Sequence, residues 1–216
     1  MRALAFGDSL TAGYLQGGHT FRPYAQRLQL LAGERWRVEH VGLSGFTACR
    51  MAEIIDTHAP IEDVCGRSWR GGLRAHLRDA ASAGAPFALV LILAGTNDLA
   101  EVMARRSRPQ DVVAALRALH ASARGCGCLT VALTVPEHPA EGAAGGAGVR
   151  HAREAINAGL RALAVQGDVD ALADIAAALP HSDPSLWDDG LHLSGRGYDR
   201  LAELAYEHAR GTFDRV

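Results

Sequence analysis

The sequence contains no long apolar segment. None of its apolar runs approaches the ~18–20 residues that a transmembrane helix needs, so we expect no membrane-spanning segment. The run that follows Met1 and Arg2 is short, and Gly7 and Asp8 interrupt it, which is untypical of a secretory signal peptide. We therefore expect a cytoplasmic protein without a signal peptide, unless a targeting segment has been removed from the chain.

Cysteine and net charge are also low. Cys49, Cys65, Cys126 and Cys128 are too few for a disulfide scaffold at this length. Cys126 and Cys128 do not have CxxC spacing, and no second pair completes a zinc site. We expect four free thiols, with a Cys49–Cys65 disulfide as the alternative. The formal net charge of −2 gives no reason to expect binding to nucleic acid or to an anionic membrane.

Strand-like and helical segments alternate along the chain, which favours a parallel sheet covered by helices. The predicted strands are residues 2–7, 35–42, 87–95, 128–136 and 169–175. The predicted helices are residues 21–33, 73–84, 109–125, 148–167 and 194–211. The pattern predicts an α/β fold, a three-layer α/β/α sandwich with a central parallel sheet of about five strands. A chain of 216 residues fits one such domain, spanning residues 1–216.

Four short motifs lie beside these predicted elements. GDSLTAG follows the first strand, GLSGFTA the second and AGTNDLA the third, whereas WDDGLHLSGRGY precedes the last helix. Ligands of open parallel sheets bind beyond the carboxyl ends of the strands. We therefore expect the first three motifs to meet at one edge of the sheet. The long connection 46–86 and the Gly/Ala-rich segment 137–148 are irregular, and such loops are often functional.

With these motifs the chain resembles the GDSL, or SGNH, hydrolase family, whose four blocks are named for a Ser, a Gly, an Asn and a His. The corresponding residues are Ser9 in GDSL, Gly45 in LSGFT, Asn97 in GTND and His192 in DGLH. They occur in the family's order and extend over nearly the whole chain. The resemblance implies a flavodoxin-like fold and a serine hydrolase with an acyl-serine intermediate, needing no metal and no organic cofactor.

Ser9 has two interpretations. A serine at a strand-to-helix turn is commonly the N-cap of the helix. The same position offers free backbone N–H groups and the positive end of the helix dipole, so Ser9 can also present a hydroxyl to a substrate. A serine hydroxyl needs a base to become a nucleophile. Because the other motifs supply a base and oxyanion donors, we predict that Ser9 is the nucleophile.

His192 is the predicted base. Asp189 precedes it by three residues, so both side chains can point the same way on a turn. Asp189 then accepts from one imidazole nitrogen and leaves the other to face Ser9. None of the nine other histidines has a carboxylate at this spacing. The alternative is a capping Asp and an exposed His near a helix start.

Asn97 and Gly45 are predicted to bind the oxyanion. An Asn side-chain amide donates hydrogen bonds, whereas the adjacent Asp98 carboxylate does not. Gly45 allows the backbone to approach the substrate closely. Together with the N–H of Ser9 they form a predicted oxyanion hole of three donors. The alternative is that Asn97 and Gly45 only shape turns.

Some residues compete with this assignment or depart from the family pattern. Ser44 lies in GLSGF, a near miss for a GxSxG nucleophile elbow, because Phe46 replaces the last glycine. Glu137-His138 is the nearest rival to the acid–base pair. His40 stands where the family often carries an asparagine. Asp188 has the wrong spacing to orient His192, and we assign it a capping or solvated role.

The predicted reaction is hydrolysis of carboxylic esters, with short-chain acyl or aryl esters favoured by the small chain. Six apolar residues beside the motifs are predicted to line the substrate pocket, although each could equally serve ordinary packing: Leu10, Phe46, Leu99, Val102, Trp187 and Leu191. Alternatives are an acyltransferase, a thioesterase or a lysophospholipase using the same residues, and a non-catalytic binding module. The expected partner is a small-molecule ester, with no nucleic acid.

Overall fold

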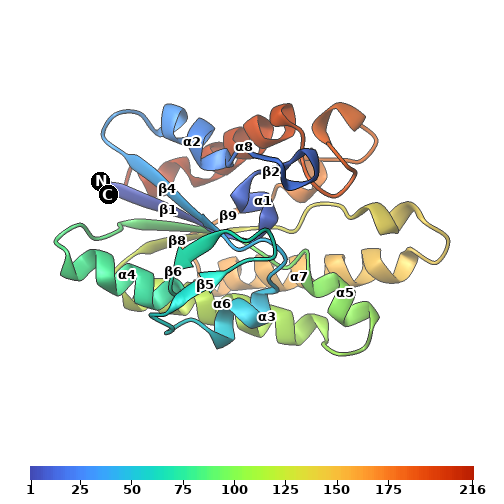
Figure 1. The fold of residues 1–216 in the computed structure, drawn as a ribbon, viewed down its shortest axis with the longest axis horizontal. Coiled ribbons are helices and arrows are strands. Elements are labelled where there is room, and N and C mark those ends of the chain that lie inside the picture. Colours follow the sequence, from blue (N-terminus) through green and yellow to red (C-terminus); the bar gives the residue numbers. More distant parts are fainter.

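A five-stranded sheet lies at the centre of the computed structural model, which describes residues 1–216 (Figure 1). In spatial order its strands are β4 (Arg37–Gly42), β1 (Arg2–Gly7), β7 (Leu89–Leu93), β8 (Leu129–Leu133) and β9 (Ala171–Ala173). Every neighbouring pair is parallel. The first strand has the second on one side and the other three on the other side, which is the flavodoxin-like order. The predicted α/β class and parallel sheet are confirmed.

Helices cover both faces of the sheet, as its apolar strands require. All five residues of β7 are buried, which is typical of a central parallel strand. Along β1, Ala3 and Ala5 pack into one core cluster and Leu4 and Phe6 into the other. The two clusters lie on opposite faces because successive side chains of a strand point to opposite sides.

The helices form two layers, above and below the sheet in Figure 1. One layer consists of α2 (Tyr24–Ala32) and α8 (Gly195–Phe213). The other consists of α3 (Ala48–Glu53), α4 (Leu73–Ser82), α5 (Asp98–Met103), α6 (Pro109–Gly125) and α7 (Ala147–Gln166). The predicted three-layer sandwich is therefore confirmed. None of these helices combines the length and the hydropathy that crossing a membrane requires.

Two small hairpins were absent from the sequence prediction. The helix predicted over 21–33 begins only at Tyr24, because Pro23 has an extended conformation and precedes the helix as its N-cap. Phe21 belongs instead to β3 (Thr20–Phe21), which pairs with β2 (Tyr14–Leu15) around the short 3₁₀ helix η1 (Gln16–Gly18).

The long connection 46–86 also contains more structure than its sequence indicated. It holds α3 before α4, and between them β5 (Pro60–Glu62) pairs with β6 (Ser68–Arg70). Three further 3₁₀ helices occupy later loops: η2 (Pro139–Gly142), η3 (Ala176–Ala178) and η4 (Pro184–Leu186). Helix η2 lies in the Gly/Ala-rich segment, where Glu141 forms an ion pair with the buried Arg153.

The ends of three neighbouring strands bring three of the motifs together. Gly7 at the end of β1 is paired with Gly42 of β4 on one side and with Leu93 of β7 on the other. The segments that follow these residues therefore leave the sheet side by side, as expected from the motifs. Gly7 has no room for a side chain, because an added Cβ would lie 1.9 Å from the carbonyl oxygen of Leu93.

Candidate active site

Ser9 is the first residue of the one-turn helix α1 (Ser9–Ala12), directly after β1. The N-cap of this helix is Asp8, whose side chain accepts the N–H of Leu10 at 3.0 Å. Ser9 therefore does not cap the helix, and the alternative interpretation of this serine is wrong. The Ser9 N–H donates no hydrogen bond within the protein, as expected in the first turn of a helix.

His192 contacts both Asp189, three positions before it, and Ser9, 183 positions before it. Its Nε2 lies 3.0 Å from the Ser9 Oγ. Its Nδ1 lies 2.8 Å from the Asp189 Oδ2. With the proton on Nδ1, the imidazole donates to the carboxylate and accepts the serine hydroxyl proton at Nε2. The structure thus brings together all three residues that the sequence predicted for the nucleophile, the base and the orienting acid.

Asp189 is held by more than the imidazole. Its Oδ1 accepts the backbone N–H groups of Leu191 at 3.0 Å and His192 at 2.7 Å. Partial burial by itself would raise the pKa of Asp189, but the hydrogen bonds from His192 and from these two backbone groups bring the pKa below its usual value. The carboxylate is therefore ionised at neutral pH, as its interaction with an imidazolium requires.

Hydrogen bonds join the start and the end of the loop that carries Asp189 and His192. Trp187 and Leu193 form an antiparallel bridge, and the N–H of Asp188 donates to the carbonyl of His192 at 2.8 Å. Ser194 then caps α8 through a hydrogen bond from the N–H of Gly197 to its hydroxyl at 3.1 Å. These contacts fix the loop to the start of a long helix.

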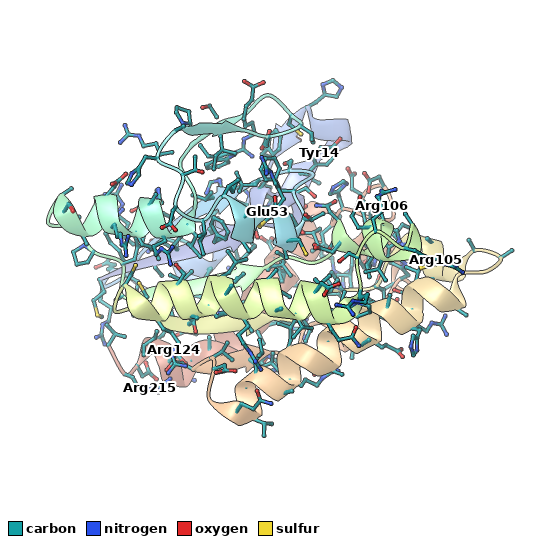
Figure 2. The ribbon with its side chains drawn as sticks, turned by 90° about the horizontal axis from the view of Figure 1, so that it is seen from below. Tyr14, Glu53, Arg105, Arg106, Arg124 and Arg215 are labelled. Atoms are coloured by element: carbon teal, nitrogen blue, oxygen red, sulfur yellow. The ribbon has the colours of Figure 1, made fainter.

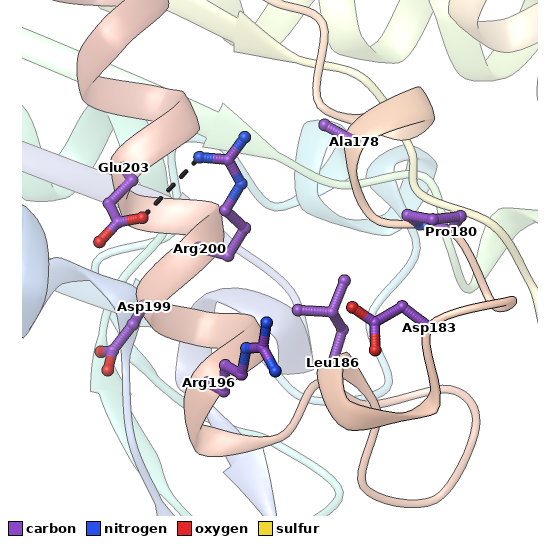
Figure 3. Close-up of a pocket in the computed structure, with 8 residues that line it drawn as sticks. All are labelled: Ala178, Pro180, Asp183, Leu186, Arg196, Asp199, Arg200 and Glu203. Atoms are coloured by element: carbon purple, nitrogen blue, oxygen red, sulfur yellow. Dashed lines mark ion pairs between the residues drawn. The ribbon is translucent and has the colours of Figure 1, made fainter.

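A pocket lies near this loop but does not include Ser9, Asp189 or His192. Figure 3 shows it between the start of α8, which carries Arg196, and the 3₁₀ helix η4, which ends at Leu186. Its lining is mostly charged and includes the ion pair Arg200–Glu203. Ser9, Asp189 and His192 do not line it. It is therefore not part of the candidate active site.

The predicted oxyanion donors lie at the same edge of the sheet. Gly45 has a φ of +79°, a conformation that favours glycine, and its N–H donates no hydrogen bond within the protein. Asn97 directly precedes α5, and its Nδ2 donates to the carbonyl of Phe46 at 2.9 Å. A side-chain amide carries two N–H bonds, so one remains after this contact. Asn97 thereby also fixes the loop that contains Gly45.

Asp98 is a further residue of this edge, and the sequence reasoning did not assign it a role. Its carboxylate is buried and accepts the N–H groups of Ala48 at 2.7 Å and Cys49 at 3.3 Å. Burial raises the pKa of Asp98 above its usual value. The carboxylate ties the first turn of α3 to the start of α5, so it holds the Gly45 loop beside Asn97. No spacing rule signals such a contact.

The β5–β6 hairpin packs against the oxyanion loop. The N–H of Ser44 donates to Asp63 Oδ2 at 3.3 Å, and the N–H of Val64 donates to the carbonyl of Ser44 at 3.3 Å. A Cβ added to Gly45 would lie 2.7 Å from a methyl group of Val64. A side chain at position 45 is therefore excluded by both its dihedral angle and this neighbour.

The predicted pocket-lining residues divide into two groups. Leu10 and Leu99 are each 1% exposed and lie in the core clusters on opposite faces of the sheet, and Trp187 is also buried in the core. The prediction is wrong for these three, because their side chains stabilise the fold instead of facing a substrate. The other three are only partly buried: Phe46, Val102 and Leu191.

Ser44, the rival nucleophile, lacks a base. Ser44 is 1% exposed, and its hydroxyl has no hydrogen-bond partner within the protein, so no base activates it as a nucleophile.

All four cysteines are free thiols, so the alternative Cys49–Cys65 disulfide is wrong. No group of three or more His, Cys, Asp or Glu side chains is arranged to hold a metal ion.

Asp8, directly before Ser9, is fully buried. Its Oδ2 has no hydrogen-bond partner within the protein. Burial raises the pKa of Asp8 to about 7, although the hydrogen bond from the Leu10 N–H lowers it. An unfolded chain holds this carboxyl near the ordinary value of 3.8. Between the two values the folded protein therefore binds one proton more than the unfolded chain.

We expect Asp8→Asn to change how stability depends on pH. The contribution of Asp8 to the free energy of unfolding falls as the pH rises through the window from 3.8 to about 7, because unfolding there releases a proton that the folded state holds. Asparagine imitates the neutral acid, so the variant lacks this fall and gains about 4 kcal/mol over the wild type near pH 8.

Urea unfolding near pH 5 and near pH 8 measures this difference. The exposed Asp214 offers a control, since Asp214→Asn is expected to keep the wild-type pH dependence. An identical fall of the free energy of unfolding in Asp8→Asn and wild type would contradict the assignment.

Comparisons with known proteins agree with this fold. The sequence model of the GDSL-like Lipase/Acylhydrolase family matches residues 5–200. The crystal structure of TesA has a TM-score of 0.68 at 21% identity, covering 98% of this chain and 99% of that one. A lipolytic protein of the G-D-S-L family from Veillonella parvula has a TM-score of 0.67 at 16% identity, with coverage of 100% and 99%.

An acetyl xylan esterase from Geobacillus stearothermophilus has a TM-score of 0.63 at 19% identity, covering 95% of this chain and 93% of that one. No curated protein matches the chain at a significant level. At these identities the solved structures establish the fold, and the match over residues 5–200 establishes the relationship in sequence.

Proposed function

Because the chain belongs to the GDSL-like lipase/acylhydrolase family, we propose that it hydrolyses carboxylic esters through an acyl-serine intermediate. The observation that carries this proposal is the hydrogen-bonded chain from Ser9 through His192 to Asp189, with distances of 3.0 and 2.8 Å. These two hydrogen bonds place a nucleophile, a base and an orienting carboxylate within contact distance of one another.

In the proposed reaction the Ser9 Oγ attacks the ester carbonyl while His192 Nε2 takes the hydroxyl proton. The carbonyl oxygen becomes an oxyanion, which accepts from the N–H of Ser9, the N–H of Gly45 and the amide of Asn97. Both backbone groups lack acceptors within the protein, which supports this role. Collapse of the intermediate breaks the C–O bond, and His192 gives its proton to the departing alcohol.

Water completes the cycle. His192 takes a proton from a water molecule, whose oxygen attacks the acyl carbon and forms a second oxyanion at the same donors. Breakdown releases the carboxylic acid and returns the proton to Ser9. Asp189 stabilises the imidazolium in both halves of the reaction and keeps Nδ1 protonated in between.

Short acyl groups on larger alcohols are the proposed substrates. The chain has only 216 residues and no evident lipid-binding extension, which favours short acyl groups. A structural neighbour is an acetyl xylan esterase, so acetyl esters are the first to test.

A series of p-nitrophenyl esters from acetyl to dodecanoyl, with acyl thioesters beside it, tests the proposal. We expect kcat/KM to be highest for the shortest acyl groups and to be lost in Ser9→Ala. An added alcohol distinguishes acyl transfer from hydrolysis, since transfer produces a new ester. The absence of turnover for every ester and thioester, in protein shown to be folded, would contradict the proposed function.

We expect Asn97→Ala to lower kcat by ~10²–10³-fold, equivalent to about 2.7–4 kcal/mol, because one oxyanion donor is removed. KM should change little, since the lost contact forms mainly in the transition state. Asn97→Asp is the matched variant, because it keeps the shape but offers no N–H. Steady-state kinetics with the best ester measure both, and an unchanged kcat in either variant would exclude the oxyanion role.

A further inference from the structure

The ring of Tyr14 lies on the ring of His192. Their centroids are 4.0 Å apart and their planes differ by 29°, which is a stacked arrangement. Tyr14 belongs to β2, at the edge of the fold in Figure 2, and it is half-buried. The sequence reasoning did not assign this residue, because a two-residue strand has no detectable periodicity.

Three contacts fix the β2–β3 hairpin: one to α8, one to the loop that carries His192, and one between its own two strands. The hydroxyl of Tyr198 on α8 donates to the carbonyl of Tyr14 at 2.9 Å. The N–H of Gln16 donates to Asp188 Oδ2 at 2.7 Å. Phe21 packs its ring against that of Tyr14 in an edge arrangement, with centroids 6.0 Å apart. The position of the Tyr14 ring is therefore set by both the helix and the loop.

The backbone conformation of Gln16 allows the hydrogen bond that joins the hairpin to Asp188. Gln16 has a φ of +51°, which is uncommon for a residue with a side chain. In this conformation its N–H donates to the carboxylate of Asp188, the residue directly before Asp189. Asp188 thus joins the hairpin to the loop and does not contact the imidazole nitrogens, which bond to Asp189 and Ser9.

The imidazole needs this support because its loop is at the surface. The side chain of Asp189 is 44% exposed, whereas that of His192 is 12% exposed. Hydrogen bonds at Nδ1 and Nε2 fix the two ends of the ring but act in its plane. A stacked aromatic ring restrains motion out of that plane, and its face also attracts a cation. Both effects favour the imidazolium that forms as Ser9 loses its proton.

We propose that Tyr14 is a positioning residue that holds His192 between Ser9 and Asp189 and stabilises its charged form through the ring face. The role rests on the proposed function, in which His192 is the base. Two carboxylates lie on the loop of His192. Asp189 contacts Nδ1, and Asp188, whose N–H donates to the His192 carbonyl, turns its carboxylate to the N–H of Gln16.

The test compares Tyr14→Leu with Tyr14→Phe. Leucine keeps an apolar cover over His192 but has no ring, and we expect kcat to fall by about 10–100-fold with KM nearly unchanged, as for a small misplacement of a catalytic group. Phenylalanine keeps the ring and should retain most of the wild-type kcat. Equal losses in both variants, or no loss in Tyr14→Leu, would overturn the proposal.

The pH profile separates the two effects of the ring. A base must be neutral to accept the Ser9 proton, and a ring that favours the imidazolium moves the acidic limb of kcat/KM to higher pH. Its removal in Tyr14→Leu should therefore move that limb to lower pH by about half a unit. Tyr14→Phe should keep the wild-type limb. A limb that is unmoved in Tyr14→Leu would contradict the electrostatic part of the proposal.

Phe21→Leu is the control for a merely structural effect. It removes the edge contact with Tyr14 and the contact between the Phe21 ring and the guanidinium of Arg67, 4.1 Å from the ring centroid. It leaves the Tyr14 ring on His192. Wild-type kcat and an unmoved pH profile are expected. A loss as large as that of Tyr14→Leu would show that hairpin packing, and not the stacked ring, matters.

An NMR measurement makes the stack testable without turnover. A ring 4.0 Å from the imidazole shifts the His192 ring protons upfield. We expect the shift in wild type and Tyr14→Phe and its loss in Tyr14→Leu. If the protein hydrolyses no ester but shows this pattern, the stack stands and the proposed function fails. If esters are hydrolysed and the shift is absent from the wild type, the proposal for Tyr14 fails alone.

Discussion

Ser9→Ala is expected to lower kcat for ester hydrolysis by about 10⁶-fold, the loss typical of removing the nucleophile of a serine hydrolase. The expectation follows from the contact between the Ser9 Oγ and His192 Nε2 at 3.0 Å, since no other hydroxyl is hydrogen-bonded to this imidazole. The remaining rate reflects substrate binding and the oxyanion donors that the variant keeps.

Ser44→Ala is the matched control for this result. Ser44 is buried, and its hydroxyl makes no hydrogen bond within the protein, so the variant should keep both its fold and its kcat. Initial rates with the best p-nitrophenyl ester, together with thermal unfolding of each protein, measure the difference. A Ser9→Ala protein that retains a substantial part of the wild-type kcat would exclude Ser9 as nucleophile.

Asp189→Asn is expected to lower kcat by about 10⁴-fold while leaving the loop in place. The asparagine oxygen can still accept the N–H groups of Leu191 and His192, as Oδ1 of Asp189 does now. Its NH₂ group then faces Nδ1 of His192, which must become an acceptor. The proton therefore moves to Nε2, and the imidazole cannot take a proton from Ser9.

Asp188→Asn separates this effect from a general loss of negative charge in the loop. Asp188 accepts the N–H of Gln16, and an asparagine oxygen can replace it there. We expect Asp188→Asn to retain most of the wild-type kcat. The pH dependence of kcat and circular dichroism of both variants complete the comparison. Similar activities for Asp188→Asn and Asp189→Asn would contradict the orienting role of Asp189.

The sequence was sufficient to predict which motifs meet. Buried apolar strands such as β7 are recognisable from composition, and parallel strands place the motifs that follow them at one edge of the sheet, where the structure pairs Gly7 with Gly42 and Leu93. The spacing of Asp189 and His192 confines both to one turn, so their contact was also predictable. The catalytic roles of these residues stay predictions until they are measured.

Contacts made by short segments could not be predicted. The β2–β3 hairpin has only two residues in each strand, too few for a pattern, so the stack of Tyr14 on His192 was not foreseen. The carboxylate of Asp98 binds backbone groups of α3, fifty positions away, and no residue type marks such a partner. Leu10 was misassigned because the direction of a side chain on a one-turn helix depends on what that helix packs against.

Mapping the adduct of a fluorophosphonate tests the central claim most directly, because this reagent reports an activated serine and does not require knowledge of the substrate. Trypsin separates Ser9, within residues 3–27, from Ser44, within residues 38–50, since the bond before Pro23 resists cleavage. We predict a single adduct on the peptide that contains Ser9, and no adduct in Ser9→Ala. An adduct on the Ser44 peptide, or persistent labelling of Ser9→Ala, would contradict the account.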